Sequence, residues 1–211
     1  MKVLRHEKSC EEALVNPMVA RKEETRRRIV ETAARLFLEK GVDRVGVDEI
    51  MRECGLTHGG FYGHFQSKEA LVSEACMAAL DETVDQWERL ARKLGDEQVW
   101  KQFLKKYLSG DLASENNPAC PAAILGADVA RRQDTIQAGY VARVNGLIDK
   151  IAKESGSDRR HAIVTFAALV GATSLAAQCG NDKALAEELL NTTREELLKC
   201  RPGHTPAADK T

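Results

Sequence analysis

Apolar side chains recur every three or four residues through most of the chain, and no segment alternates apolar and polar residues as a strand does. Such spacing places the apolar residues of a segment on one face of a helix. Apolar residues make up 43% of the 211, enough to build a core, while aromatic residues are scarce at 5%. The sequence therefore predicts an all-α protein of about nine helices.

The chain is predicted to consist of a small helical head and a larger helical body. Residues 1–20 have no helical period and contain Pro17, so we expect a disordered N-terminal extension. Residues 21–70 are assigned to the head and 71–200 to the body, and the polar residues 201–211 are expected to form a flexible tail. The predicted helices cover about 24–40, 47–54, 58–65, 67–94, 98–108, 121–132, 134–154, 158–179 and 182–199.

Two short helices of the head are separated by the turn Cys54-Gly55-Leu56-Thr57. A short turn that contains glycine between two helices is typical of a helix-turn-helix. Gly55 ends the first helix, and Thr57 can cap the second. Because so small a head has little apolar area of its own, we expect the long helix 67–94 to brace it. The predicted head core comprises Ile29, Ala33, Phe37, Val45, Ile50, Leu56, Phe61 and Phe65.

The second of these helices contains three glycines, at positions 59, 60 and 63. Each glycine costs a helix about 1 kcal/mol relative to alanine. This cost is explained if the backbone must approach another surface closely, and the phosphates and base edges of DNA are such a surface. The alternative is that the stretch is a glycine-rich loop.

Polar side chains that can donate hydrogen bonds lie next to these glycines in the sequence. Thr57, His58, Tyr62 and His64 are predicted to face away from the core, where they can donate to phosphate oxygens. Lys68 lies in the first turn of the next helix, where an amine and exposed amides can together hold a phosphate. These residues are the candidate DNA contacts, and the alternative for each is an ordinary surface residue.

Net charge gives no support to a nucleic-acid partner. The chain has a formal charge of −1, and residues 1–70 contain 13 basic and 12 acidic side chains. One local basic cluster, residues 26–28, makes Arg27 a further candidate DNA contact. A charge run of this kind is also typical of a solvated helix face. The prediction of DNA binding therefore rests on where individual residues lie and not on the net charge.

The head resembles the tetracycline-repressor (TetR/AcrR) family over residues 24–71, while the remainder resembles it by helix count only. The strings that carry the resemblance are Val47-Asp48-Glu49-Ile50, Gly55-Leu56-Thr57-His58-Gly59-Gly60-Phe61-Tyr62-Gly63-His64-Phe65 and Ser67-Lys68-Glu69-Ala70-Leu71. The resemblance implies a transcriptional regulator, most simply a repressor, that binds a palindromic double-stranded DNA operator as a homodimer. It also implies release when a small-molecule effector binds the body.

The same resemblance implies roles for individual residues of the head. The backbone and side chains of Thr57, His58, Gly59 and Gly60 would approach bases, while Tyr62, His64 and Lys68 would hold phosphates. One position departs from the family: Gly46 stands where a capping threonine or serine is usual. We therefore do not predict for Gly46 the phosphate contact that the family makes at this position.

In the body, the last two long helices are the predicted dimer interface. The first has a stripe of small and apolar residues that allows close helix approach, and the second supplies a leucine face. The alternative is that both are core helices of a single chain. The candidate interface residues are Val164, Ala168, Gly171, Ala172, Leu175 and Leu189.

Aromatic residues near the middle of the body are the candidate effector pocket, although such residues are also common in cores. Cys120 is a further candidate, because it would lie near a helix N-terminus, where a thiolate is favoured. Some family members with a similar segment sense electrophiles or oxidants, whereas a lone cysteine is usually a small buried side chain. The pocket candidates are Trp87, Trp100, Phe103, Tyr107, Cys120 and Phe166.

Several other classes of protein find no support in the sequence. No catalytic motif is present, and the six cysteines are scattered without a Cys-x-x-Cys pair, so we expect no enzyme activity, no metal and no cofactor. The N-terminus lacks the apolar segment of a signal peptide, and no membrane span is predicted, so we expect a cytoplasmic protein. A helical adaptor without DNA binding remains the alternative function.

Overall fold

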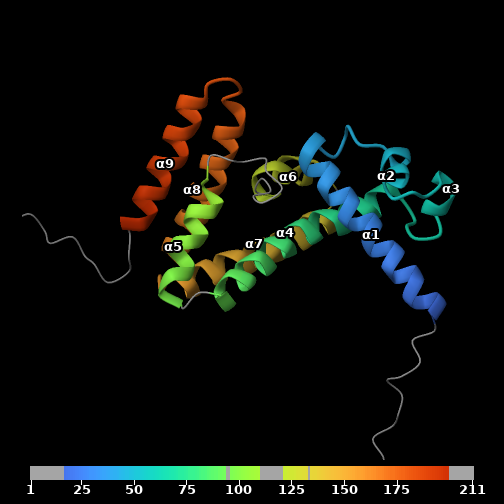
Figure 1. Ribbon diagram of the computed structural model, residues 1–211, viewed down its shortest axis with the longest axis horizontal. Coiled ribbons are helices and arrows are strands. Elements are labelled where there is room, and N and C mark those ends of the chain that lie inside the picture. The colour runs from blue at the N-terminus through green and yellow to red at the C-terminus, as the bar shows by residue number, and fades with distance from the viewer. Residues whose placement is uncertain (1–16, 94–95, 110–120, 133, 200–211) are drawn as a thin grey trace, which may run out of the picture.

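The computed structural model describes residues 17–93, 96–109, 121–132 and 134–199, and this part of the chain is helical with no strand (Figure 1). The prediction of an all-α protein of about nine helices is confirmed. The helices are α1 (Pro17–Lys40), α2 (Val47–Glu53), α3 (His58–Phe61), α4 (Lys68–Lys93), α5 (Asp96–Tyr107), α6 (Pro121–Ala130), α7 (Asp134–Ser155), α8 (Arg159–Gln178) and α9 (Lys183–Lys199).

Helices α1 to α3 and the first half of α4 form one apolar core, to which α6 and the start of α7 also contribute. Glycines with positive φ end α1 and α2, since Gly41 has φ 83° and Gly55 has φ 66°, values that side-chain-bearing residues rarely adopt. Ser67 caps α4 by accepting a hydrogen bond from the amide of Ala70 at 3.1 Å. The predicted core residues of the head are all buried except Leu56, which is half-buried.

Helix α4 joins the head to the body. Its N-terminal half gives Leu71, Val72 and Ala75 to the head core, and α1 packs along it. Its C-terminal half gives Trp87 to a second core formed with α5, α7, α8 and α9. One continuous helix therefore contacts both cores.

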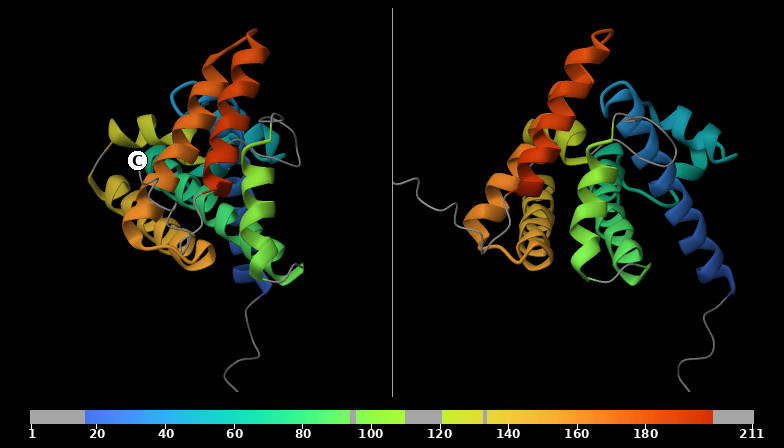
Figure 2. Two further views of the ribbon diagram at one scale, coloured as in Figure 1. Left: turned by 90° about the vertical axis from the view of Figure 1, so that its left-hand side faces the viewer. Right: turned by 60° about the vertical axis from the view of Figure 1, so that its left-hand side comes forward.

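Helices α8 and α9 form a pair at the opposite end of the molecule from α3 (Figures 1 and 2). By length and composition α8 could cross a membrane, but it packs against α6, α7 and α9, as an apolar helix inside a folded body does. Only 33% of its most apolar stretch is buried in the single chain, so an apolar face is left uncovered.

Two predicted helix boundaries in the head are wrong. Helix α1 begins at Pro17 and not near Glu24, so residues 17–20 are helical; a proline fits the first position of a helix, where no amide hydrogen is needed. Helix α3 ends at Phe61 and not at Phe65, because Gly63 and His64 continue the chain with tight turns onto the carbonyls of Gly60 and Phe61. Residues 1–16 and 200–211 lie outside the described residues.

Candidate nucleic-acid interface

Backbone geometry fixes the turn between α2 and α3. The amide of Gly55 donates to the Arg52 carbonyl at 2.9 Å, and the amide of Leu56 donates to the Met51 carbonyl at 2.8 Å. Thr57 then takes an extended conformation at the N-cap of α3, although its side chain makes no capping hydrogen bond. Helix α3 is consequently held by packing, since Phe61 is only 1% exposed and its ring stacks on that of Phe65 at 5.6 Å.

The glycines of α3 have no internal reason to lack a side chain. A Cβ added at Gly59 would meet no atom within 4 Å, and one at Gly60 would make only ordinary contacts at 3.7 Å. Neither residue has a positive φ. Both are exposed, so the missing side chains leave the backbone of α3 open to the outside of the molecule.

The exposed side chains around α3 include three candidate DNA contacts, Thr57, His58 and Tyr62. Tyr62 is 64% exposed, and its ring lies edge-on to Phe61 at 5.3 Å. His58 pairs through Nδ1 with the carboxylate of Asp48 in the first turn of α2. This pairing links the two helices of the motif on their exposed side, and it was not predicted from the sequence.

His64 is half-buried, unlike its exposed neighbours. Burial lowers the pKa of its imidazole, and the charges of Lys22 and Arg26 lower it further. At neutral pH the ring is therefore uncharged and donates from one nitrogen only. Its Nδ1 is buried and has no partner in the part of the chain that the structure describes.

Arg26 is a positioning residue that sequence analysis missed within the basic cluster 26–28. Its guanidinium donates to the backbone carbonyl of His64 and pairs with Glu74 of α4, and it lies 4.0 Å above the Phe65 ring. It thus joins α1 to α4 and to the turn after α3. Arg27, the predicted contact, is exposed and pairs with Glu24 and Glu31 of its own helix.

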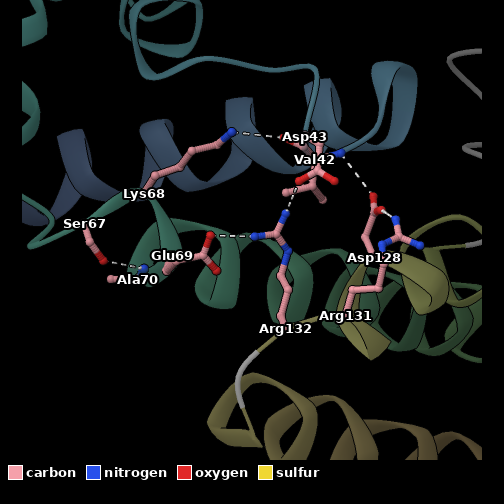
Figure 3. A network of polar contacts seen from close by, with 9 residues as sticks. All are labelled: Val42, Asp43, Ser67, Lys68, Glu69, Ala70, Asp128, Arg131 and Arg132. Carbon is pink, nitrogen blue, oxygen red and sulfur yellow. Dashed lines mark hydrogen bonds and ion pairs between the residues drawn. The ribbon is translucent and has the colours of Figure 1, made fainter.

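Lys68 is already engaged within the protein, since its Nζ donates to the Val42 carbonyl at 3.2 Å (Figure 3). An ammonium group has three donors, so the remaining two are available to a phosphate. Gly46 at the N-cap of α2 offers no side-chain hydrogen bond.

An ionic joint links the head to α6, and we define it by Val42, Asp43, Glu69, Asp128 and Arg132 (Figure 3). Arg132 donates to Glu69 of α4 at 2.5 Å and to Asp43 of the α1–α2 loop at 2.6 Å. Asp128 of α6 accepts the amide of Val42 at 3.1 Å. The same loop is thus held by Lys68 from one side and by α6 from the other.

A mainly apolar cavity lies between α4, α5, α7, α8 and the start of α6, with about 310 Å³ of empty space including the part open to solvent. The Trp87 and Phe103 rings stack at 3.8 Å in its wall, to which Tyr107 and Phe166 also contribute. Trp100 packs against these rings but does not line the cavity. Cys120 lies outside the described residues.

The predicted dimer residues divide between the surface and the core. Val164 is 65% exposed and Leu175 is 52% exposed, whereas Ala168, Gly171 and Leu189 are half-buried. Ala172 is buried in the core of the body, so the prediction that it faces a partner chain is wrong. Leu185, which belongs to the predicted leucine face, is also exposed, and so is Ile163, which the prediction did not include.

No group of three or more His, Cys, Asp or Glu side chains in the described ranges is placed to hold a metal ion. The described cysteines are Cys54, Cys76 and Cys179, all free thiols. Burial raises the pKa of Cys76 to about 11, which keeps it protonated at neutral pH.

The turn between α2 and α3, the open backbone of α3 and the bracing by α4 together define a helix-turn-helix protein. Residues 29–75 match the family described as "Bacterial regulatory proteins, tetR family". An uncharacterised HTH-type transcriptional regulator of Bacillus subtilis, YerO, is 36% identical over 85 residues, which is 40% of this chain and 29% of YerO. The head of this chain is therefore similar to the DNA-binding domain of the tetR family over residues 29–75.

Solved structures match over the body as well as the head. Reduced NemR of Escherichia coli has a TM-score of 0.70 at 17% identity, with 86% of this chain and all of that chain covered. A TetR-family regulator of Agrobacterium tumefaciens has a TM-score of 0.69 at 18% identity, covering 83% of this chain and 98% of that one. At these identities the similarity shows a shared fold, and the sequence match spans less than two thirds of YerO.

Proposed function

We propose that the protein is a dimeric DNA-binding transcriptional regulator, a repressor that a small-molecule effector releases from a palindromic operator. The observation that carries the proposal is the exposed backbone at Gly59 and Gly60, which no internal contact requires. It lies on the second helix of a helix-turn-helix, the element that such motifs place in the major groove. In this proposal residues 21–70 bind DNA and 71–200 dimerise and bind the effector in the cytoplasm.

The uncovered apolar face of α8 supports the dimer. Val164, Gly171 and Leu175 are spaced so that they share one side of the helix. Large apolar side chains that remain exposed together are typical of an interface. A pair of helix-turn-helix heads, one from each chain, would read the two half-sites of a palindrome.

The path of α4 supports release by an effector. Its first turn holds Glu69 in the ionic joint, and its later turns place Thr83 and Trp87 in the cavity wall. A ligand that displaces this wall also displaces the helix on which the head rests. Helix α6 completes the connection, since Pro121 lines the cavity and Asp128 belongs to the joint.

Selection of bound fragments from random double-stranded DNA, using the full chain, tests the proposal. We expect enrichment of inverted repeats whose halves are about one helical turn apart, or a multiple of it. Affinity for the selected site should fall steeply as salt rises, because phosphate contacts release counterions. A chain that enriches no sequence would instead support the helical adaptor. No described residue favours the Cys120 sensor.

Gly59→Ala is expected to separate DNA binding from stability. Alanine at this exposed helical position should leave the free energy of unfolding unchanged or raise it by up to about 1 kcal/mol. Affinity for the selected DNA should fall about tenfold, because the added methyl group blocks the close approach of α3. Urea unfolding and fluorescence anisotropy with labelled DNA measure the two effects.

Gly146 of α7 provides the matched control, since it is also exposed and an added Cβ there meets no atom within 4 Å. Gly146→Ala should change stability in the same direction and leave DNA affinity as in the wild type. Equal DNA binding by Gly59→Ala and Gly146→Ala would show that α3 makes no close approach.

A further inference from the structure

The cavity beside Trp87 has stacked aromatic rings in its wall. The Trp87 and Phe103 rings stack face to face, with planes 20° apart and centroids at 3.8 Å, and Trp100 packs against Trp87 at 28°. Such a stack favours a flat aromatic ligand that continues it in an offset arrangement. The remaining wall includes Leu147 and Phe166, which add further apolar surface.

Charge in and around the cavity favours a neutral ligand. None of the described residues that line it carries a charge at neutral pH, so a buried carboxylate would have no cationic partner in the lining. A cation is disfavoured for a different reason. Lys150 already places its ammonium 5.8 Å from the Trp87 ring centroid, where it is paired with Glu88 at 3.5 Å, so a second positive charge would meet a like charge.

One polar group at the wall lacks a partner. Trp87 is 1% exposed, and its indole Nε1 finds no acceptor among the residues that the structure describes. A buried donor without an acceptor is costly, and a ligand that supplies an acceptor removes that cost. Thr83 does not compete for this role, because its hydroxyl donates to the Ala79 carbonyl at 3.3 Å.

We infer that the effector is an uncharged, flat aromatic compound with a hydrogen-bond acceptor, which stacks against the Trp87–Phe103 wall and accepts from the Trp87 indole. This inference rests on the proposed function, because only that function makes a ligand of this cavity an effector. The enclosed part of the cavity is narrow, with room for about one water-sized molecule. A ring that enters must therefore part α4 from α5, which is the movement that release requires.

Four naphthalene probes of similar size test the inference on the full chain by isothermal titration calorimetry. They are 2-acetonaphthone, which is neutral with an acceptor; naphthalene, which has none; 2-naphthoate, an anion; and trimethyl(2-naphthylmethyl)ammonium, a cation. We expect 2-acetonaphthone to bind at least about tenfold more tightly than either ion, since burial of an unpaired charge is costly. It should also release the selected DNA.

Trp87→Phe keeps the ring and removes the donor. It should weaken 2-acetonaphthone binding about fivefold and leave naphthalene binding unchanged. Trp100→Phe is the control, and it should leave both affinities unchanged because Trp100 does not line the cavity. Thermal unfolding checks that both variants are folded, and the comparison among probes on the wild type needs no variant.

Tighter binding of either ion, no binding of any probe, or equal effects of the two tryptophan variants would overturn the inference. Measurement of DNA binding on the same sample distinguishes its failure from that of the proposed function. A chain that binds selected DNA but no neutral ring is still a DNA-binding regulator. A chain that binds 2-acetonaphthone as expected but no DNA retains the ligand site and is not the proposed repressor.

Discussion

Replacement of Phe61 by alanine is expected to lower the free energy of unfolding by about 3–5 kcal/mol and to abolish specific DNA binding. A helix as short as α3 has no stability of its own, and no side chain caps its N-terminus. The buried ring of Phe61, packed on Phe65, is what holds the exposed backbone of Gly59 and Gly60 in place. Urea unfolding and anisotropy with the selected DNA measure both losses.

The adjacent residue provides the matched control for this prediction. Tyr62→Ala should change the free energy of unfolding by no more than about 0.5 kcal/mol, because most of the tyrosine side chain is in solvent. It should nevertheless weaken DNA binding and reduce its dependence on salt, as expected for a lost phosphate contact. If Phe61→Ala still bound DNA specifically, α3 would not be the recognition helix.

Leu175→Arg is expected to dissociate the dimer and to lower affinity for a palindromic site by at least about 100-fold. The residue is exposed in the single chain, so the folded body tolerates the arginine. In the dimer the same side chain would place a charge without a partner in the apolar interface, which is strongly unfavourable. Analytical ultracentrifugation and anisotropy on full and half operators check the two effects.

Val141→Arg on α7 is the control for this second prediction. Val141 is an exposed branched apolar residue, as Leu175 is, but it lies outside the α8–α9 face. It should leave both the mass in solution and the DNA affinity unchanged. A Leu175→Arg protein that remained dimeric would place the interface on another surface.

Helical periodicity predicted the fold well because most helices bury one side. The prediction from periodicity failed where a helical segment does not bury one side. Met18 and Val19 in the first turn of α1 are exposed, so this turn has no buried apolar stripe to recognise. In α3 the four-residue spacing of Phe61 and Phe65 suggested a continuing helix, but Gly63 between them favours a turn.

The sequence predicted which side chains are exposed at the candidate DNA interface, but not which residues they contact. Tyr62 and Thr57 are exposed, as their spacing indicated. The interactions of His58 with Asp48 and of Arg26 with Glu74 join residues far apart in the chain, and sequence gives no distance between such residues. Ala172 lies one position from Gly171, which is enough on a helix to turn a side chain inward.

The ionic joint makes the contact between the head and the body depend on salt concentration, which the apolar cavity does not. Arg132 is 12% exposed in its side chain, but its partners Asp43 and Glu69 face water and are 70% and 42% exposed. Dissolved ions screen exposed charges over a Debye length of about 8 Å at physiological ionic strength, and this length shortens as the salt concentration rises. A rise in salt would therefore loosen the contact between the head and α6. The attachment of the head to the body should then depend on ionic strength, whereas the packing of the apolar cavity should not.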